Sequence, residues 1–198
     1  MPVESPGPRF QHLESILRRW EHLGERKTTL GATLIGRVPH VGPEAWLHEV
    51  YKGLSEQELA VLEEALPSPI PVVFQDFLRR ANGLKMFSDR MSISGFRAAI
   101  SRNGDGRYQP YDLREDNDPD GPPSRRPESI LVFGHCGENE SAVFFDLKLG
   151  PQQSRVGMTL MDSFREVQSW PDFWTWVVHE TERLARNCDR QGDRKSVE

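Results

Sequence analysis

The sequence contains little cysteine and no long hydrophobic run. Only two of its 198 residues are cysteines, Cys136 and Cys188, which is too few for a disulfide framework and favours a reducing compartment. No stretch reaches the ~18 consecutive apolar residues that a membrane helix needs. The first eight residues, MPVESPGP, lack the basic start and the apolar centre of a signal peptide. These absences predict a cytoplasmic protein that makes no contact with a membrane.

The sequence also lacks an excess of positive charge. Its 25 lysines and arginines face 30 aspartates and glutamates, so the formal net charge is −5. Nucleic-acid phosphates reward a basic surface, and this balance therefore argues against direct binding of nucleic acid. It mildly favours a basic partner, although charge alone does not identify one.

The common catalytic and nucleotide-binding motifs are missing. The chain has no G-x-x-x-x-G-K-[ST], no G-x-G-x-x-G after an apolar run, no G-x-S-x-G and no H-E-x-x-H. Its paired carboxylates occur only as runs such as Glu63-Glu64, which are typical of solvated faces. The sequence therefore predicts a binding module, with no enzymatic activity, cofactor or metal.

One segment carries both a start and a stop signal for a short amphipathic helix. Pro71 suits the first helical turn, where its missing N–H costs nothing. Phe74, Phe77, Leu78 and Ala81 follow at helical spacing and predict one buried face. Asn82-Gly83 can close the helix in a left-handed conformation, after which the chain should enter a strand. We expect the rest of the chain to pack around this helix.

The remaining pattern predicts an α+β fold with one mostly antiparallel twisted sheet, flanked by N-terminal helices, a central helix and a C-terminal helix. Further helices are expected over residues 10–23, 43–53, 55–66 and 163–184, and strands over 91–96, 130–134, 142–147 and 156–161. The two middle strands should form a hairpin whose turn contains Gly137. Residues 28–38 remain open between a loop and a short strand.

The length allows one domain of ~150 residues with tails and a large loop. We assign residues 10–187 to this domain, and expect residues 1–9 and 188–198 to be disordered. An acidic insertion rich in proline and glycine should lie at about 101–129 and be largely solvated.

The central segment resembles the signature L-P-x-x-Y-x-x-F-L-x-x-N-G of the SUKH superfamily, which includes yeast Smi/Knr-type cell-wall regulators and bacterial immunity proteins. Ile70-Pro71, Phe74, Phe77-Leu78 and Asn82-Gly83 carry this similarity. Three downstream pieces agree in order: Ile93-Ser94-Gly95, the hairpin from Ile130 to Leu147, and Ser163-Phe164 before the last helix. The resemblance covers roughly residues 54–184. The chain departs from the family in its long insertion and in its Glu138-Asn139-Glu140 turn, where glycines are usual.

Two strings resemble reactive sites and have plainer explanations. His135-Cys136 offers an imidazole and a thiol, but adjacent residues of an extended chain point to opposite faces and no further ligand pair accompanies them. Asp116 to Gly121 reads D-N-D-P-D-G, like the start of a calcium loop. The glutamate expected at the twelfth loop position is replaced by Pro127, so a solvated acidic loop is the favoured interpretation.

The resemblance implies a protein partner, most often a toxin domain such as a nuclease that the immunity protein neutralises. An acidic surface could cover the basic cleft of such a toxin. The candidate residues for that surface are Glu115, Asp116, Asp118, Asp120, Glu138, Asn139 and Glu140. We expect a monomer or a weak dimer. The yeast relatives imply the alternative, an intracellular regulatory or scaffold protein without a toxin partner.

Overall fold

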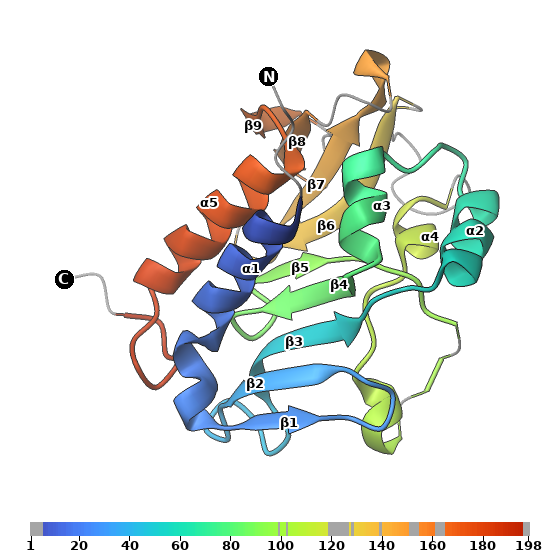
Figure 1. Cartoon of the computed structure of the whole chain (residues 1–198). Coiled ribbons are helices and arrows are strands. Elements are labelled where there is room, and N and C mark those ends of the chain that lie inside the picture. The colour runs from blue at the N-terminus through green and yellow to red at the C-terminus, as the bar shows by residue number, and fades with distance from the viewer. Residues whose placement is uncertain are drawn as a thin grey trace.

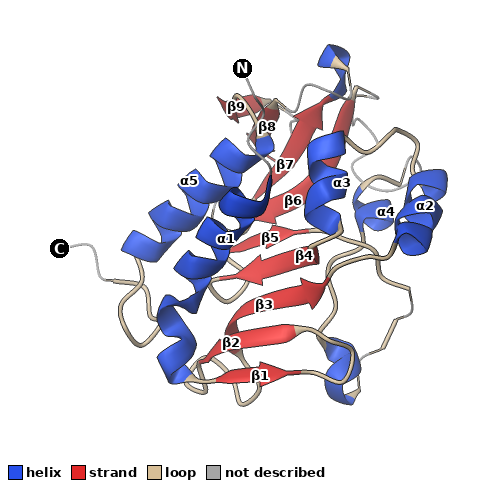
Figure 2. Cartoon of the chain, viewed as in Figure 1, coloured by secondary structure: helices blue, strands red, loops and turns tan. Residues whose placement is uncertain are grey.

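The computed structural model describes residues 6–98, 100–101, 103–118, 127, 129–138, 140–150, 155–160 and 165–195. Across these residues each strand pairs antiparallel with the next along the chain, giving a nine-stranded sheet (Figures 1 and 2). The strands are β1 (Glu25–Lys27), β2 (Thr33–Arg37), β3 (Trp46–Lys52), β4 (Ala81–Met86), β5 (Met91–Ile93), β6 (Ile130–Cys136), β7 (Ser141–Asp146), β8 (Val156–Leu160) and β9 (Glu166–Trp170).

Helices α1, α3 and α5 lie over one face of this sheet (Figure 1). The helices are α1 (Pro6–Leu17), α2 (Glu56–Ala65), α3 (Val72–Leu78), α4 (Leu113–Asp116) and α5 (Phe173–Arg186), with short 3-10 turns η1 (Arg18–Leu23), η2 (Gly104–Arg107) and η3 (Leu147–Leu149). None of the helices in the described ranges is long and apolar enough to span a membrane. The α+β architecture with one antiparallel sheet, flanking helices and a C-terminal helix is confirmed.

The core is centred on aromatic side chains that α3 contributes between the sheet and α5. Phe74 lies 5.3 Å from Phe133 of β6 in a tilted arrangement, and Phe77 lies 5.1 Å from Phe173 of α5, measured between ring centroids. Both α3 phenylalanines are fully buried. Aromatic pairs at these distances add roughly 0.5–1.5 kcal/mol each beyond the burial of their area. The prediction that the Pro71–Gly83 segment organises the fold is confirmed for its helical part.

Side-chain caps mark the starts of helices α2 and α5. Ser55 and Glu58 form the predicted capping box at the start of α2, with the Glu58 carboxylate 2.8 Å from the Ser55 backbone nitrogen. Asp172 caps α5 by accepting a hydrogen bond of 2.9 Å from the backbone N–H of Thr175. The α5 start predicted at Ser163 is wrong, because Glu166 begins strand β9 and the helix begins ten residues later than the S-x-x-E pattern suggested. Ser163 and Phe164 themselves lie outside the described residues.

The helix predicted over residues 43–53 is a strand. Residues Trp46–Lys52 form β3, which pairs with β2 on one side and β4 on the other. Its apolar residues satisfy both a helical and an alternating spacing, and the sequence window was too short to separate the two. Pairing on both edges decides in favour of the strand. Residues 28–38, which the sequence left open between a loop and a short strand, contain strand β2 (Thr33–Arg37) of the same sheet.

The two glycines expected to shape turns act differently from the prediction. Helix α3 ends at Leu78, and Asn82-Gly83 belongs to strand β4 instead of closing the helix. Gly83 does have a positive φ of 85°, and an added Cβ would lie 2.5 Å from the Ile93 carbonyl oxygen. In the predicted β6–β7 hairpin, which is confirmed, Glu140 takes the positive φ at 49°, and Gly137 does not.

Both ends of the domain extend beyond the predicted boundaries. Helix α1 already begins at Pro6, within the stretch 1–9 that was expected to be disordered. Cys188, placed in the expected tail, is buried and pairs as an isolated bridge with Arg194. The indole Nε1 of Trp20 donates a 2.7 Å hydrogen bond to the carbonyl oxygen of Asp189. Residues 188–195 therefore pack against the N-terminal part of the domain.

The described part of the predicted insertion also has structure. Asp112 pairs with Gly95 in a parallel bridge, and Tyr108 packs with Leu34 and Tyr51 on the sheet face opposite to α1. The carboxamide of Asn117 donates to the Val132 carbonyl at 2.6 Å and accepts from the Val132 N–H at 3.0 Å. Residues 103–118 thus form a strap on the second face of the sheet, anchored to β6.

Candidate functional site

The second face of the sheet, opposite to α1 and α5, carries a row of polar residues. Glu49, Lys85, Ser92 and His135 are direct cross-strand partners on β3, β4, β5 and β6. Alternate residues of these strands, such as Met86 and Cys136, point into the main core. The pleat therefore separates a hydrophobic face beneath the helices from a titratable row beneath the strap.

The row is completed by residues from the strap and the β4–β5 turn. The Lys85 ammonium lies 4.3 Å from the ring centroid of Tyr111, within the range of a cation–π contact. The Tyr111 hydroxyl donates a hydrogen bond to Asp89. The Tyr51 hydroxyl donates to Glu49 at 2.7 Å, yet burial raises the pKa of Glu49 above its usual range despite that bond.

The adjacent His135 and Cys136 lie on opposite faces, as their extended spacing predicts. Cys136 is buried on the helix side, where burial, aided by the charge of Glu180, raises the pKa of its thiol to about 12. A thiol with this pKa is protonated at neutral pH and is a poor nucleophile. The two side chains consequently form no dyad.

His135 instead pairs with a residue of α4. Its Nε2 lies 3.2 Å from Oδ1 of Asp116, and the other oxygen of Asp116 accepts a 2.5 Å hydrogen bond from the Ser94 hydroxyl. Burial lowers the pKa of His135, but the hydrogen bond and the charge of Asp116, with a smaller contribution from Asp89, raise it above its ordinary value. Asp116, a candidate for partner contact, is thus committed to a contact inside the fold.

Two other strap candidates lie beside an acidic hollow at α4. A cavity of 400 Å³ is lined by Asp112, Arg114, Glu115, Asn117 and Asp118, together with Ala65 and Pro67 after α2. Arg114 pairs with Asp112 at 2.6 Å, and Arg97 pairs with Glu115. The structure therefore brings Glu115 and Asp118 together at one accessible edge. Asp120 lies outside the described residues.

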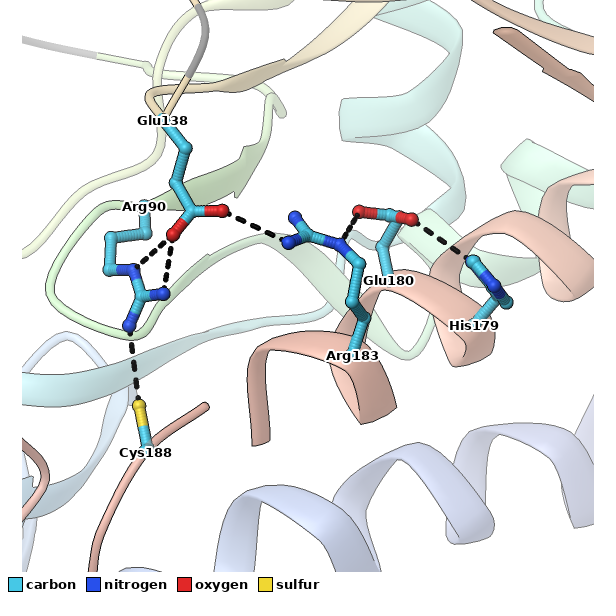
Figure 3. A network of polar contacts seen from close by, with 6 residues as sticks. All are labelled: Arg90, Glu138, His179, Glu180, Arg183 and Cys188. Carbon is cyan, nitrogen blue, oxygen red and sulfur yellow. Dashed lines mark hydrogen bonds and ion pairs between the residues drawn. The ribbon is translucent and has the colours of Figure 1, made fainter. Parts of the chain in front are cut away.

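The remaining candidates for partner contact belong to the β6–β7 turn. The structure pairs one of them, Glu138, with side chains of the same chain. Figure 3 shows Glu138 held between two arginines, with Arg90 Nη2 at 2.5 Å and Arg183 Nη1 at 3.1 Å. Burial raises the pKa of Glu138, but the hydrogen bonds and charges of the two arginines outweigh this and lower it. Glu138 is a structural anion, whereas Glu140 is exposed and Asn139 lies outside the described residues.

The arginines extend this network across four segments. Arg90 also directs Nη1 toward the Cys188 sulfur at 3.4 Å, and Arg183 donates from Nε to Glu180 at 2.8 Å (Figure 3). His179 reaches the same carboxylate at 3.0 Å. The β4–β5 turn, the β6–β7 turn and α5 are thereby joined through charged side chains, and the C-terminal segment is joined to them through the Cys188 thiol.

The sequence reasoning missed the basic half of these contacts. Arg90 and Arg183 are 48 and 45 residues from Glu138, and Asp116 is 19 residues from His135. Such separations leave no local spacing signal, and only the order of the strands brings the partners together. Within the residues that the structure describes, no three His, Cys, Asp or Glu side chains are grouped so that they could hold a metal ion.

A comparison with known families matches the part of the chain that contains the Pro71–Gly83 segment. The model of the SMI1/KNR4 family (SUKH-1) matches residues 53–179, which include α2, α3, the strands β4 to β9 and the first half of α5. The matched region also contains the strap, the α4 hollow and the Glu138 turn. No curated protein matches the chain.

Proposed function

Since the chain belongs to the SMI1/KNR4 family (SUKH-1), we propose that it is a non-catalytic protein-binding module that acts as an immunity protein toward a toxin domain. The main support for the proposal is that several titratable groups of the chain are buried or paired within the fold. The Cys136 thiol is buried, His135 is tied to Asp116, and Glu138 is tied to two arginines. These groups stabilise the fold, and inhibition would come from occupying the surface of another protein.

The α4 hollow is the proposed contact surface for a basic region of the toxin domain. It presents Glu115 on the short helix α4 and Asp118 just after it, and this segment is fixed by the Asn117 hydrogen bonds to β6. A rigid acidic edge suits the capture of a basic cleft, because charge complementarity speeds association and little order must be gained on binding. The net charge of the chain is −5, so the whole protein also attracts a basic partner at long range.

The test uses the full chain and the C-terminal domain of a toxin gene beside its own gene. We expect co-expression to relieve growth arrest by that domain, and the purified proteins to form a stable complex. Replacement of both acids, Glu115→Gln with Asp118→Asn, should weaken binding about 10–100-fold, as expected for one or two lost charge-assisted contacts. Glu44→Gln, which removes one exposed charge elsewhere, is the matched control and should leave binding unchanged.

Two outcomes would contradict the proposal. Survival of the toxin's lethality in the presence of the chain, with no complex detected, would reject the immunity role. Capture of a resident cellular protein in the absence of any neighbouring toxin gene would favour the regulatory alternative.

A further inference from the structure

A second hollow lies on the strap side of the Arg97–Glu115 pair. Its volume is 400 Å³, and its lining includes Lys85, Arg97, Arg107, Gln109, Tyr111 and Glu115. Glu115 also lines the acidic α4 hollow, so one ion pair separates two cavities of different charge. The α4 side is rich in carboxylates, whereas this side holds three cations and one carboxylate.

Two of the three cations have no carboxylate partner among the described ion pairs. Lys85 rests on the ring of Tyr111, and Arg107 donates from Nε to the backbone carbonyl of Gly104 at 3.0 Å. The Tyr111 ring is fixed in turn by its hydroxyl bond to Asp89. These contacts hold the cations at the hollow and leave most of their donors free of acceptors within the described part of the chain.

Arg97 adds a separate observation that points to a missing acceptor. Its Nη2 is bonded to Glu115, but its Nε is buried and has no acceptor among the described residues. A buried donor without an acceptor destabilises the fold, because it has lost its hydrogen bond to water and gained none in return. An anionic oxygen entering the hollow would face Lys85, Arg97 and Arg107, which all line it.

Nearby carboxylates form no ion pair with Lys85 or Arg107 among the described residues. Glu49 lies across from Lys85 on β3, where the charge of Lys85 acts on it and its carboxylate accepts the hydroxyl of Tyr51. Asp89 accepts the hydroxyl of Tyr111. Both acids therefore have a tyrosine partner, and neither lines the hollow.

We infer that this hollow, named here the strap pocket, receives an acidic side chain of the protein partner. The inference rests on the proposed function and specifies the partner more narrowly. A partner that places a basic group at the α4 hollow and an aspartate or glutamate in the strap pocket would match both charges at once. Such paired complementarity fixes the register of an interface and rejects partners with only one sign of charge.

The experiment measures binding of fluorescent acetyl-tetraglutamate-amide to the full chain by anisotropy at low ionic strength. We expect saturable binding that Lys85→Met and Arg107→Gln each weaken about tenfold, as for the loss of one charged hydrogen-bond donor. Lys27→Met removes an exposed cation from β1 and serves as the matched control, which should bind like the parent. Lys85→Arg should retain binding, and thermal unfolding of each variant checks that the fold is intact.

Several results would overturn the inference: no saturable binding, an equal loss in Lys27→Met, or equal binding of acetyl-tetralysine-amide. Competition by inorganic phosphate at lower concentration than by acetate would assign the pocket to a phosphate-bearing ligand, and this too would overturn it. The toxin domain separates the two proposals. If Lys85→Met and Arg107→Gln bind that domain normally, the strap-pocket inference fails and the immunity proposal stands. If the peptide binds as expected and the toxin domain does not, the immunity proposal fails.

Discussion

The side chain of Asn82 forms two hydrogen bonds with the backbone of Phe96, as a neighbouring strand would. Its Nδ2 donates to the Phe96 carbonyl at 2.7 Å, and its Oδ1 accepts from the Phe96 N–H at 2.6 Å. Asn117 makes the same pair of bonds with Val132. The two carboxamides thus satisfy backbone groups of Phe96 and Val132, and the Asn117 bonds fix the C-terminal end of the strap to β6.

Replacement of Asn82 by alanine should destabilise the domain by about 2–4 kcal/mol, because it leaves both the N–H and the carbonyl of Phe96 without a partner. Equilibrium unfolding in urea would measure the change. Asn103→Ala is the matched control, since this asparagine is exposed and makes no capping bond at η2. Equal midpoints for the two variants would contradict the assigned role.

Removal of Glu138 should also destabilise the fold. Glu138→Ala leaves Arg90 and Arg183 facing each other without the shared anion, and the side chains concerned are only partly exposed, at 19% for both Glu138 and Arg90. A partly buried pair lies between the small effect of a surface pair and the 3–5 kcal/mol of a buried one, so we expect about 1–3 kcal/mol. Chemical denaturation would measure it.

Glu140→Ala provides the comparison within the same turn. Glu140 is exposed, and its substitution should change stability by less than about 0.5 kcal/mol. If Glu140→Ala weakens toxin binding and Glu138→Ala does so only in proportion to unfolding, the turn contributes to the interface through Glu140. The reverse pattern would return Glu138 to the list of contact residues.

His48 should make the domain sensitive to mild acid. Its ring is fully buried against Trp20 and Phe87, and burial lowers its pKa from 6.5 to about 3. A folded-state pKa below the unfolded value gives stability that is present above pH 6.5 and declines as the pH falls from 6.5 toward 3. The loss should approach ~1.4 kcal/mol per pH unit within that window.

His48→Gln tests this assignment, because a glutamine can still accept the Phe87 N–H that His48 Nδ1 accepts at 3.3 Å. We expect its unfolding free energy to depend less on pH between 6.5 and 5 than that of the parent. His40→Gln, at an exposed position, should keep the parental slope. The bond matters locally, since Phe87, Ser88 and Asp89 all have positive φ, at 55°, 54° and 68°.

The sequence allowed prediction of those parts of the fold that depend on local periodicity. Phe74 and Phe77 revealed a buried helix face, Ser55 and Glu58 marked a helix start, and the apolar runs on either side of Gly137 indicated a hairpin. Strand β3 was missed because its apolar residues fit two periods, and pairing on both edges is a tertiary effect.

The candidate site was harder to predict, since charge composition does not say which charges are paired. Glu138 and Asp116 are acidic in the sequence, yet the fold gives each a partner from a distant segment. Glu115 is also paired, with Arg97, but both Glu115 and Asp118 are exposed and line the α4 hollow. Lys85 and Arg107 carried no motif at all, and only the cross-strand register and the strap bring them together.

His135 gives the opposite pH dependence to His48. Its pKa is raised above 6.5, because the bond to Asp116 outweighs burial, so its contribution is complete below pH 6.5 and is lost as the pH rises through the raised value. We expect the unfolding free energy of the parent to fall from pH 6.5 upward. His135→Gln keeps every other titrating group, and its unfolding free energy should fall less over the same pH range. Asp116→Asn should abolish the dependence as well, because the neutral amide no longer favours the imidazolium. A parental slope in either variant would show that another group titrates in this window, and that the His135–Asp116 pair does not tie α4 to β6 through its charge.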